Sequence, residues 1–265
     1  MRVRDVEYYV HTVGDGPRPV LLLHGFTGKH SNWFPAIEMF QKKHQFTFVF
    51  IDFLGHGNSD SPKEYNRYSM EETVQDLKVI IKKLGYTKLL VAGYSMGGRV
   101  ALSFAHEFPE MVEKLILESS SPGLQLEVER VERSKQDDIM AAKIEQEGVE
   151  TFIDFWVNIP LFASQQKILS EAKLNDIRNQ KLQNNVVGLS NSLRGLGTGS
   201  QPSLWDQLEH LTIPVLILVG EWDEKFVRIG EKMHEKLRNS TFLKIIGAGH
   251  AIHVEQSEKF GKIVS

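Results

Sequence analysis

The sequence predicts an α/β fold built on a mostly parallel central sheet with helices on both faces. Short apolar runs rich in valine, isoleucine, leucine and phenylalanine alternate with helix-length segments over most of the 265 residues. The runs lack the apolar–polar alternation of half-exposed strands, so they are typical of strands buried on both faces. The expected strands are Pro19–Leu23, Thr47–Asp52, Lys88–Ala92, Val112–Glu118, Pro214–Val219 and Phe242–Ile246.

Local signals predict further elements around these strands. Ser69-Met-Glu-Glu72 is a capping box, and the helix that it opens is expected to continue to about Leu84, where Gly85 ends it. Arg2–Val13 is expected to form an antiparallel hairpin at the start of the chain. Residues 1–265 are predicted to fold as a single domain, because that length suits one α/β core with an insertion.

The alternating pattern breaks between about residues 124 and 205. No strand-like run occurs there, and the stretch instead has the amphipathic pattern of several helices, interrupted at Pro160 and at Gly195–Gly199. The strand pattern resumes at Pro214. A helical block between two strands is the usual arrangement of a lid over an active site, so residues 124–205 are predicted to form an inserted helical lid.

The composition excludes several classes of function. The formal net charge is −3 and no long basic block is present, which argues against nucleic acid as a partner. No apolar run is long enough for membrane insertion. The chain has no cysteine, so disulfides, thiolate metal ligands and a cysteine nucleophile are excluded. The first residues are too charged for a signal peptide, and we expect a cytoplasmic protein whose oligomeric state stays open.

Three patterns resemble cofactor sites, but each lacks a necessary part. Gly25–His30 has glycines and a lysine without the spacing of a phosphate loop, and Gly195–Gly199 does not follow a strand. His250 and His253 could share a metal ion, yet no third ligand lies near them in the sequence. We therefore expect neither a metal ion nor an organic cofactor.

Ser95 carries the strongest catalytic signal. Gly93-Tyr-Ser-Met-Gly97 matches the pattern G-x-S-x-G, directly after a predicted strand and before a predicted helix. In that context the pattern is the nucleophile elbow of the α/β-hydrolase fold, a sharp turn that strains the serine backbone and places its hydroxyl at a helix N-terminus. The plainer alternative is an incidental serine in a tight turn, and the flanking strand and helix argue against it.

A serine needs a histidine to take its proton, and the chain has ten histidines. His24 and His56 precede Ser95 in glycine-containing turns and are expected to shape loops. His250 follows the last predicted strand, where a loop can reach over the serine, and it is the predicted base. His253 is the nearest competitor and is expected to pack or to form hydrogen bonds.

The third member of a triad is an acid that orients the imidazole and stabilises its positive charge. Asp223 follows the predicted strand Pro214–Val219 and is the predicted acid. Glu221 and Glu224 are expected to be surface charges, and Glu118, at the end of an earlier strand, is the remaining alternative. The sequence thus predicts a complete serine–histidine–aspartate triad.

A negative charge that develops on a substrate oxygen needs preorganised N–H donors. The Met96 N–H follows the serine directly and is one predicted donor of such an oxyanion hole. The Phe26 N–H, in the turn after the first core strand, is the other, because Gly25 lets that backbone approach closely.

The arginines point to an anionic substrate. Arg99 lies one turn into the helix that Ser95 opens, where a cation is mildly disfavoured, so its placement indicates a use. An ordinary interpretation stays open beside this one, because Glu129 and Arg133 have the spacing of a surface ion pair and aromatic residues can simply form the core of a lid. The candidates from the predicted lid are Arg130, Arg133, Arg178, Trp156 and Phe162.

A set of motifs between about Leu22 and Glu255 is shared with one family. They are Gly93-Tyr-Ser-Met-Gly-Gly-Arg-Val-Ala101, Glu118-Ser-Ser-Ser-Pro-Gly-Leu124, Pro160-Leu-Phe162, Gly197–Trp205, Gly220–Phe226 and Ala248–Glu255, together with Arg133 and Trp156. On these motifs the chain resembles the 2-succinyl-6-hydroxy-2,4-cyclohexadiene-1-carboxylate synthases of menaquinone biosynthesis, which belong to the α/β-hydrolase superfamily.

The resemblance implies a lyase that needs no cofactor. Such an enzyme expels pyruvate from an enolpyruvyl-cyclohexene carboxylate, with the triad abstracting the proton α to the succinyl ketone and the oxyanion hole holding the enolate. A serine esterase or carbon–carbon bond hydrolase of small organic acids is the alternative, and a non-catalytic binding protein of the same fold is a third interpretation. The substrate would be a polycarboxylate, and the resemblance implies that it is bound by Tyr94, Arg99, Arg133, Trp156, Phe162 and Arg178.

Overall fold

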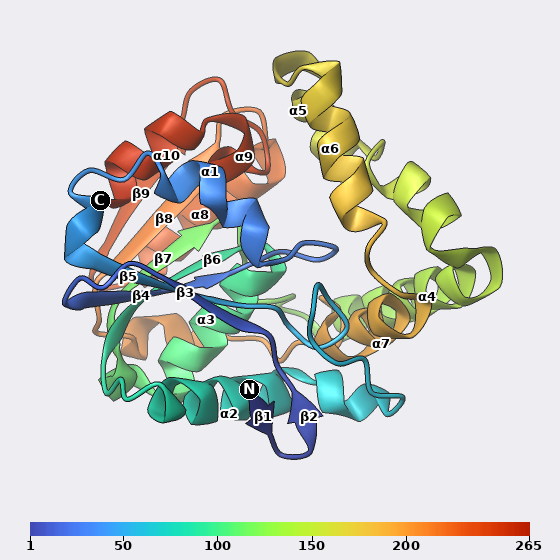
Figure 1. Ribbon diagram of the computed structural model, residues 1–265, viewed down its shortest axis with the longest axis horizontal. Helices are drawn as coiled ribbons and strands as arrows, with labels where there is room; N and C mark the ends of the chain where they lie inside the picture. Colours follow the sequence, from blue (N-terminus) through green and yellow to red (C-terminus); the bar gives the residue numbers. More distant parts are fainter.

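The structure, a computed structural model that describes residues 1–265, is built on a seven-stranded sheet (Figure 1). The order across the sheet is β3-β5-β4-β6-β7-β8-β9, and every neighbouring pair is parallel except β3 with β5. The predicted α/β fold with a mostly parallel sheet is therefore confirmed. The strands are β1 (Arg2–Val3), β2 (Val6–Glu7), β3 (Val10–Val13), β4 (Arg18–Leu23), β5 (Phe46–Ile51), β6 (Leu89–Tyr94), β7 (Val112–Glu118), β8 (Val215–Gly220) and β9 (Ser240–Ile245).

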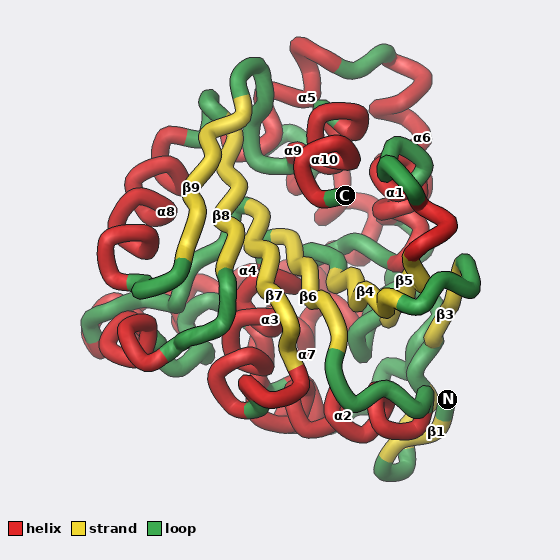
Figure 2. The backbone as a smooth tube through the Cα atoms, turned by 90° about the vertical axis from the view of Figure 1, so that its left-hand side faces the viewer, coloured by secondary structure: helices red, strands yellow, loops and turns green.

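Helices cover both faces of this sheet (Figure 2). Successive side chains of a strand point to opposite faces. Leu21 and Leu23 accordingly pack in the core that contains residues of α2, α3 and α8, whereas Val20 and Leu22 pack in the core beneath α1, α9 and α10. The α-helices are α1 (Phe34–Ile37), α2 (Met70–Lys83), α3 (Met96–Glu107), α4 (Glu127–Trp156), α5 (Ala163–Ile168), α6 (Glu171–Lys181), α7 (Val186–Leu196), α8 (Glu224–Lys236), α9 (Ile252–Glu255) and α10 (Ser257–Val264).

Six short 3-10 helices lie in the connections. Half of the predicted capping box is present, since the Ser69 hydroxyl accepts a hydrogen bond from the Glu72 N–H and caps α2. The reciprocal bond is absent, because the Ser69 N–H donates to the Asn66 carbonyl oxygen and the Glu72 carboxylate pairs with arginines. The 3-10 helices are η1 (His30–Trp33), η2 (Lys43–Gln45), η3 (Tyr65–Tyr68), η4 (Pro109–Met111), η5 (Pro160–Phe162) and η6 (Trp205–His210).

The first thirteen residues pair differently from a single hairpin. β1 and β2 form a small antiparallel sheet of their own, with Val3 opposite Val6. β3 then leaves this hairpin and becomes the antiparallel edge strand of the main sheet, with Val10 opposite Ile51. Tyr8, in the link between β2 and β3, is buried, and its hydroxyl donates to the Asp76 carboxylate at 2.8 Å. This hydrogen bond holds the chain where it passes from the small sheet to the main sheet.

The chain between β7 and β8 is helical, as the break in the sequence pattern predicts. Helices α4 to α7, residues 127–196, are called the helical insertion below. α4 bends at Gly148, whose φ of 84° is outside the helical range. α4 and α7 share a small apolar core that includes Ile144, Phe152 and Leu189. Figure 1 shows α5 and α6 beyond the carboxyl ends of the strands, where a lid would lie.

The carboxyl ends of β4, β6, β7 and β8 meet at one edge of the sheet, because these strands are parallel neighbours. The loops that follow them therefore converge, and in open α/β sheets such an edge is where ligands bind. A helix that crosses a membrane needs a long apolar stretch, and none of the helices has one.

Candidate active site

Ser95 lies in a strained turn between β6 and α3. Its backbone angles, φ 51° and ψ −110°, fall in a region that residues with side chains rarely occupy. A Cβ on Gly93 would lie 2.3 Å from the Gly97 carbonyl oxygen, and one on Gly97 would lie 2.1 Å from the Leu23 carbonyl oxygen. Both glycines are therefore required for the turn to close, and the turn holds the Ser95 hydroxyl at the carboxyl edge of the sheet.

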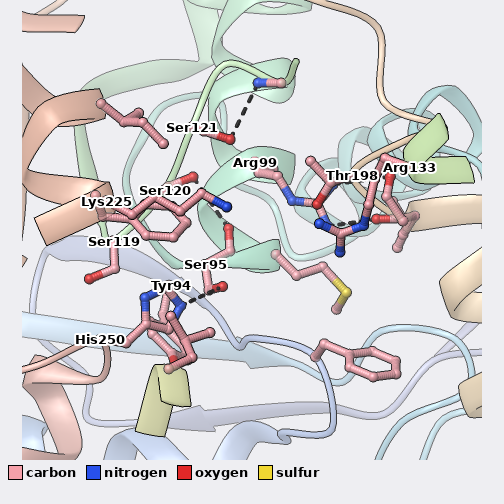
Figure 3. Close-up of a pocket in the computed structure, with 18 of the residues that line it drawn as sticks. Tyr94, Ser95, Arg99, Ser119, Ser120, Ser121, Arg133, Thr198, Lys225 and His250 are labelled. Carbon is pink, nitrogen blue, oxygen red and sulfur yellow. Dashed lines mark hydrogen bonds between the residues drawn. The ribbon is translucent and has the colours of Figure 1, made fainter. Parts of the chain in front are cut away.

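Ser95, His250 and Asp223 are joined by two hydrogen bonds, of which Figure 3 shows the one between Ser95 and His250. The Ser95 hydroxyl lies 3.0 Å from His250 Nε2, and His250 Nδ1 lies 2.5 Å from Asp223 Oδ2. His250 and Asp223 are buried. Because the Nδ1–H donates to the carboxylate, Nε2 is free to accept the serine proton, which is the arrangement that a serine–histidine–aspartate triad requires.

His253, the competing histidine, is engaged elsewhere. Its backbone N–H and its Nδ1 both donate to the Glu118 carboxylate, at distances up to 3.0 Å. Its ring stacks on the Trp33 ring, with the centroids 4.3 Å apart. Glu118, the alternative acid, is fully buried, and its carboxylate accepts hydrogen bonds from His253. This pair anchors the chain that follows His250 to the end of β7.

His24 and His56 cross-link backbone in the neighbouring loops. His24 Nε2 accepts from the Phe53 N–H at 3.0 Å, and its Nδ1 donates to the Gly25 carbonyl oxygen at 2.8 Å. His56 Nδ1 donates to the Leu54 carbonyl oxygen at 3.2 Å. Burial lowers the pKa of both rings, that of His56 to about 3, so both are neutral at neutral pH.

The two predicted oxyanion donors, Phe26 and Met96, border the same cavity as Ser95. Met96 is the first residue of α3, where backbone N–H groups have no acceptor within the helix. The Phe26 N–H takes no part in the hydrogen bonds of its loop, which is closed by Gly28. The next residue, Thr27, has φ 64°, a left-handed conformation that is rare for a β-branched side chain. Both N–H groups are thus available, and their role stays a prediction.

A cavity of about 190 Å³ opens beside Ser95 and His250 (Figure 3). Its wall combines the strand-end loops with residues of the helical insertion. Three lining residues carry a cation, Arg99, Arg133 and Lys225, and none carries a carboxylate. This imbalance of charge favours an anionic ligand over a neutral one.

Arg99 is a buried guanidinium that contacts only neutral acceptors. Its Nη2 donates to the Leu196 carbonyl oxygen at 2.6 Å, and its Nη1 donates to Gln201 Oε1 at 3.1 Å. Burial, and after it repulsion from Arg133, lowers the pKa of Arg99 to about 10, so it remains charged at neutral pH. A buried charge without a counter-ion is costly, and a substrate carboxylate would offset that cost.

Arg133 and Arg130, from the first turns of α4, face different surroundings. Arg133 lines the cavity, and its Nε donates to Asp137 at 2.8 Å, so its partner along the helix is Asp137 and not Glu129. Its two Nη groups remain for another acceptor. Arg130 instead donates to two backbone carbonyl oxygens of the preceding turn and does not line the cavity.

Trp156, Phe162 and Tyr94 form an aromatic wall on one side of the cavity. The Trp156 ring packs edge-on against Phe26, with the centroids 5.3 Å apart, and Phe162 lies 6.1 Å from the His250 ring. The Trp156 indole N–H is buried and has no hydrogen-bond partner. Burial raises the pKa of Tyr94 well above its ordinary value, so its hydroxyl stays protonated. All three residues therefore lie where the resemblance places substrate contacts.

Arg178 lines neither cavity of the site, although the resemblance implies that it contacts substrate. Its Nε contacts Asp154 at 2.5 Å, and its Nη2 contacts Glu150 at 3.2 Å. Both carboxylates belong to α4, so Arg178 ties the outer side of α6 to α4. An α-helix turns by about 100° per residue, so an alignment error of a few residues is enough to exchange an inward for an outward side chain.

Lys181, three residues after Arg178, is the cation of α6 that points toward the loop after β4, and the sequence analysis missed it. It lines a smaller cavity of about 50 Å³ behind the aromatic wall, and its Nζ donates to Thr27 Oγ1 at 2.6 Å. Desolvation lowers the pKa of Lys181 to about 8, and no carboxylate pairs with it. A signal was present, because the apolar residues Leu174 and Ile177 define the inward face of α6 and Lys181 lies one turn further along it.

Comparison with known proteins gives consistent matches. Residues 18–257 match the family model described as the alpha/beta hydrolase fold. A Bacillus subtilis (strain 168) protein, provisionally named 2-succinyl-6-hydroxy-2,4-cyclohexadiene-1-carboxylate synthase, is 46% identical over 98% of this chain and 94% of that protein. The structure of MenH from S. aureus has a TM-score of 0.89 at 35% identity, over 98% of this chain and 96% of that chain. An esterase from Thermogutta terrifontis, with malate bound, has a TM-score of 0.84 at 26% identity, over 98% and 92%.

Proposed function

Because this chain belongs to the 2-succinyl-6-hydroxy-2,4-cyclohexadiene-1-carboxylate synthase family of the α/β-hydrolase fold, we propose that it is a lyase that expels pyruvate from an enolpyruvyl-cyclohexene carboxylate in menaquinone biosynthesis. The observation that carries the proposal is a Ser95–His250–Asp223 triad that opens into a cavity with three cations and no carboxylate. A substrate with three carboxylates matches that lining, since arginine binds carboxylates by two parallel hydrogen bonds.

The reaction begins with removal of a proton from carbon. His250 Nε2 takes the Ser95 hydroxyl proton, and the serine oxygen removes the proton α to the succinyl ketone. The electrons of the broken C–H bond move to the ketone oxygen, which becomes an enolate. The Phe26 and Met96 N–H groups would donate to that oxygen, and such donors act most strongly in a site shielded from water.

The carbon–oxygen bond breaks in the second stage. Electrons return from the enolate through the ring double bond and expel the enolpyruvyl oxygen, which leaves a cyclohexadiene and the enolate of pyruvate. Ser95 now carries the proton taken from carbon, and the proton that His250 took from the Ser95 hydroxyl is available to convert that enolate to pyruvate, which returns both residues to their starting states. No water is consumed and no covalent bond to Ser95 forms, so Ser95 acts as a base instead of a nucleophile.

Different cations would bind different carboxylates of the substrate. Arg99 and Arg133 extend toward the same part of the cavity (Figure 3), where each can bind one carboxylate. Lys181 lies behind the aromatic wall and supplies a further cation if the bound substrate extends past Phe162. The helical insertion, which contributes Arg133 and Lys181, would then act as a lid over the triad.

The alternative is an esterase or a carbon–carbon bond hydrolase of small organic acids, in which Ser95 attacks a carbonyl carbon or activates water. Its specific support is the likeness to the Thermogutta terrifontis esterase. The triad geometry suits both chemistries, because each needs the serine proton on His250. A neutral ester, however, leaves Arg99 without the counter-ion that its burial calls for.

The direct test is release of pyruvate from the enolpyruvyl substrate, followed by coupling to lactate dehydrogenase. Rates should be measured beside hydrolysis of a short neutral ester by the same preparation. The proposal expects a much higher kcat/KM for pyruvate release than for ester hydrolysis. A protein that cleaves the ester readily and releases no pyruvate belongs to the hydrolase alternative.

A further inference from the structure

The loop that carries His250 is held by a carboxylate that takes no part in the proposed reaction. Glu255 is buried, and its oxygens accept hydrogen bonds from two backbone N–H groups. The donors are Gly249, at 2.6 Å, and Ala251, at 3.3 Å. These residues stand immediately before and after His250, so one carboxylate fixes the backbone on both sides of the imidazole.

A third hydrogen bond to Glu255 comes from the helical insertion. Ser164, in α5, donates its hydroxyl to Glu255 Oε1 at 2.9 Å, although the two residues are 91 positions apart in the chain. Gly249 shows how closely α5 approaches the loop, because a Cβ there would lie 2.0 Å from Ser164 Oγ. Phe162, two residues before Ser164, packs against the His250 ring. One short segment thus contacts the His250 ring directly and its backbone through Glu255.

The bond between Ser164 and Glu255 is the one hydrogen bond that joins α5 to the loops of the sheet. A cavity of about 160 Å³ lies in the seam between them, and it is lined by Ser164, Lys167, Asp223 and Gly249 among others. Burial raises the pKa of Glu255, and the hydrogen bonds from Gly249 and Ser164 oppose that rise. A buried carboxylate depends on its donors, so movement of α5 would remove one of three and leave Glu255 less firmly bound.

We propose that Glu255 is a positioning residue for His250 and that the Ser164 hydroxyl makes this positioning depend on the seating of α5. The inference rests on the proposed function, in which His250 takes the Ser95 proton. With α5 seated, Glu255 keeps its three donors and His250 Nε2 stays 3.0 Å from the Ser95 hydroxyl. With α5 displaced, Glu255 keeps only the Gly249 and Ala251 donors and holds the backbone around His250 less firmly. The triad is then fully aligned only while α5 packs against the loop that carries His250.

The first test separates kcat from KM. Ser164→Ala removes only the donor from the insertion, and we expect kcat for pyruvate release to fall about tenfold with KM nearly unchanged. Glu255→Gln places an NH2 group against the Gly249 N–H and should reduce kcat at least as much. The double variant should be little worse than Glu255→Gln, because both changes break the same link. Ser170→Ala is the matched control, since its hydroxyl bonds only within α6, and it should leave kcat unchanged.

The second test needs no turnover of the natural substrate. A small fluorophosphonate labels a serine only as fast as its histidine activates it, so the rate of Ser95 labelling should fall in Ser164→Ala by the same factor as kcat. If Ser164→Ala lowers the melting temperature while kcat and labelling match wild type, the link is structural only and the proposal is overturned. A wild type that is labelled yet releases no pyruvate contradicts the proposed function instead, and the labelling rates of the variants then decide the positioning role alone.

Discussion

The carboxyl edge of the sheet and the helical insertion meet at one cavity, but they hold their functional side chains by different means. At the sheet edge, Ser95 is fixed by a turn that requires Gly93 and Gly97, and the backbone around His250 is held by hydrogen bonds to two buried carboxylates, Glu118 and Glu255. In the insertion, Arg133 and Lys181 are held by one hydrogen bond each, to Asp137 and Thr27 respectively. Backbone geometry places the first set, and single side-chain contacts place the second.

This difference separates the two tasks of the site. Proton transfer needs reacting atoms within hydrogen-bonding distance, which a rigid sheet supplies. Binding of a long polyanion tolerates more movement, and a mobile cover can admit it and then exclude water. We therefore expect substitutions at the sheet edge to abolish reaction with every substrate, and substitutions in the cation set to reduce reaction with anionic substrates alone.

The largest effect is expected at the triad. Ser95→Ala and His250→Ala should each lower kcat by about 10⁴-fold or more, and the double variant should be little worse, because the residues act as a unit. Circular dichroism should remain that of wild type. If Ser95→Ala keeps more than about a tenth of the wild-type rate, Ser95 is not the base.

The arginines give the next largest effect and test the selectivity of the site. Arg99→Ala and Arg133→Ala should each lower kcat/KM for pyruvate release by about ten- to a hundredfold, since each removes a charged hydrogen bond to a carboxylate. Arg→Lys should also be costly, because lysine keeps the charge and loses the two-point contact. Hydrolysis of a neutral ester by the same variants should barely change. Equal losses on both substrates would mean that the arginines support the triad and do not bind substrate.

Lys181 and Arg178 form a matched pair within one helix. Lys181→Met should lower kcat/KM for the anionic substrate about tenfold, because it removes a cation from behind the aromatic wall. Arg178→Met should change the rate less than about twofold, because it breaks only two ion pairs at the surface of the insertion. The reverse order of effects would restore Arg178 as the substrate-binding cation of α6.

The titration of Lys181 gives a pH signature. Its pKa is lowered to about 8, so the ammonium is charged below that pH and neutral above it. In wild type, kcat/KM for the anionic substrate should therefore decline as the pH rises through about 8. A profile measured for Lys181→Met should lack this decline while keeping the rest of the curve. Persistence of the alkaline limb in the variant would assign it to another group.

The smallest expected effect is that of a chelator. In the proposed mechanism, the Phe26 and Met96 N–H groups would give the electrophilic assistance that a metal ion otherwise supplies. Prolonged treatment with EDTA, followed by removal of the chelator, should leave the rate of pyruvate release unchanged. Loss of activity that returns on addition of one divalent metal would contradict this expectation.

The same difference between the two regions explains what the sequence could predict. The nucleophile elbow is a local pattern whose spacing is dictated by backbone crowding, so Ser95 and its flanking glycines were found directly. His250 and Asp223 follow from the rule that loops after parallel strands meet at one edge. The six predicted strands and the helical block between β7 and β8 rest on similarly local patterns.

What the sequence could not predict depends on contacts between distant segments. The positive charge of Arg178 is visible in the sequence, but the direction in which its side chain points is not. Arg178 points toward α4, and Lys181 is the cation of α6 that lines a cavity. The bond between Ser164 and Glu255 joins segments 91 positions apart, and neither residue stands out in the sequence. Likewise, the departure of β3 from the hairpin depends on the free edge of β5, which exists only once the sheet has formed.

The central claim is elimination by a base at a hydrolase-type triad, and the mass of the ring product tests it most directly. Wild-type protein is incubated with the enolpyruvyl-cyclohexene substrate, with Ser95→Ala as the blank, and both products are identified by mass spectrometry. The account predicts pyruvate and a cyclohexadiene in equal amounts, above the amounts in the blank. The masses of the two products should add up to the mass of the substrate, with no water added. A ring product heavier by one water, or cleavage of the succinyl side chain without release of pyruvate, would show hydrolysis and contradict the account.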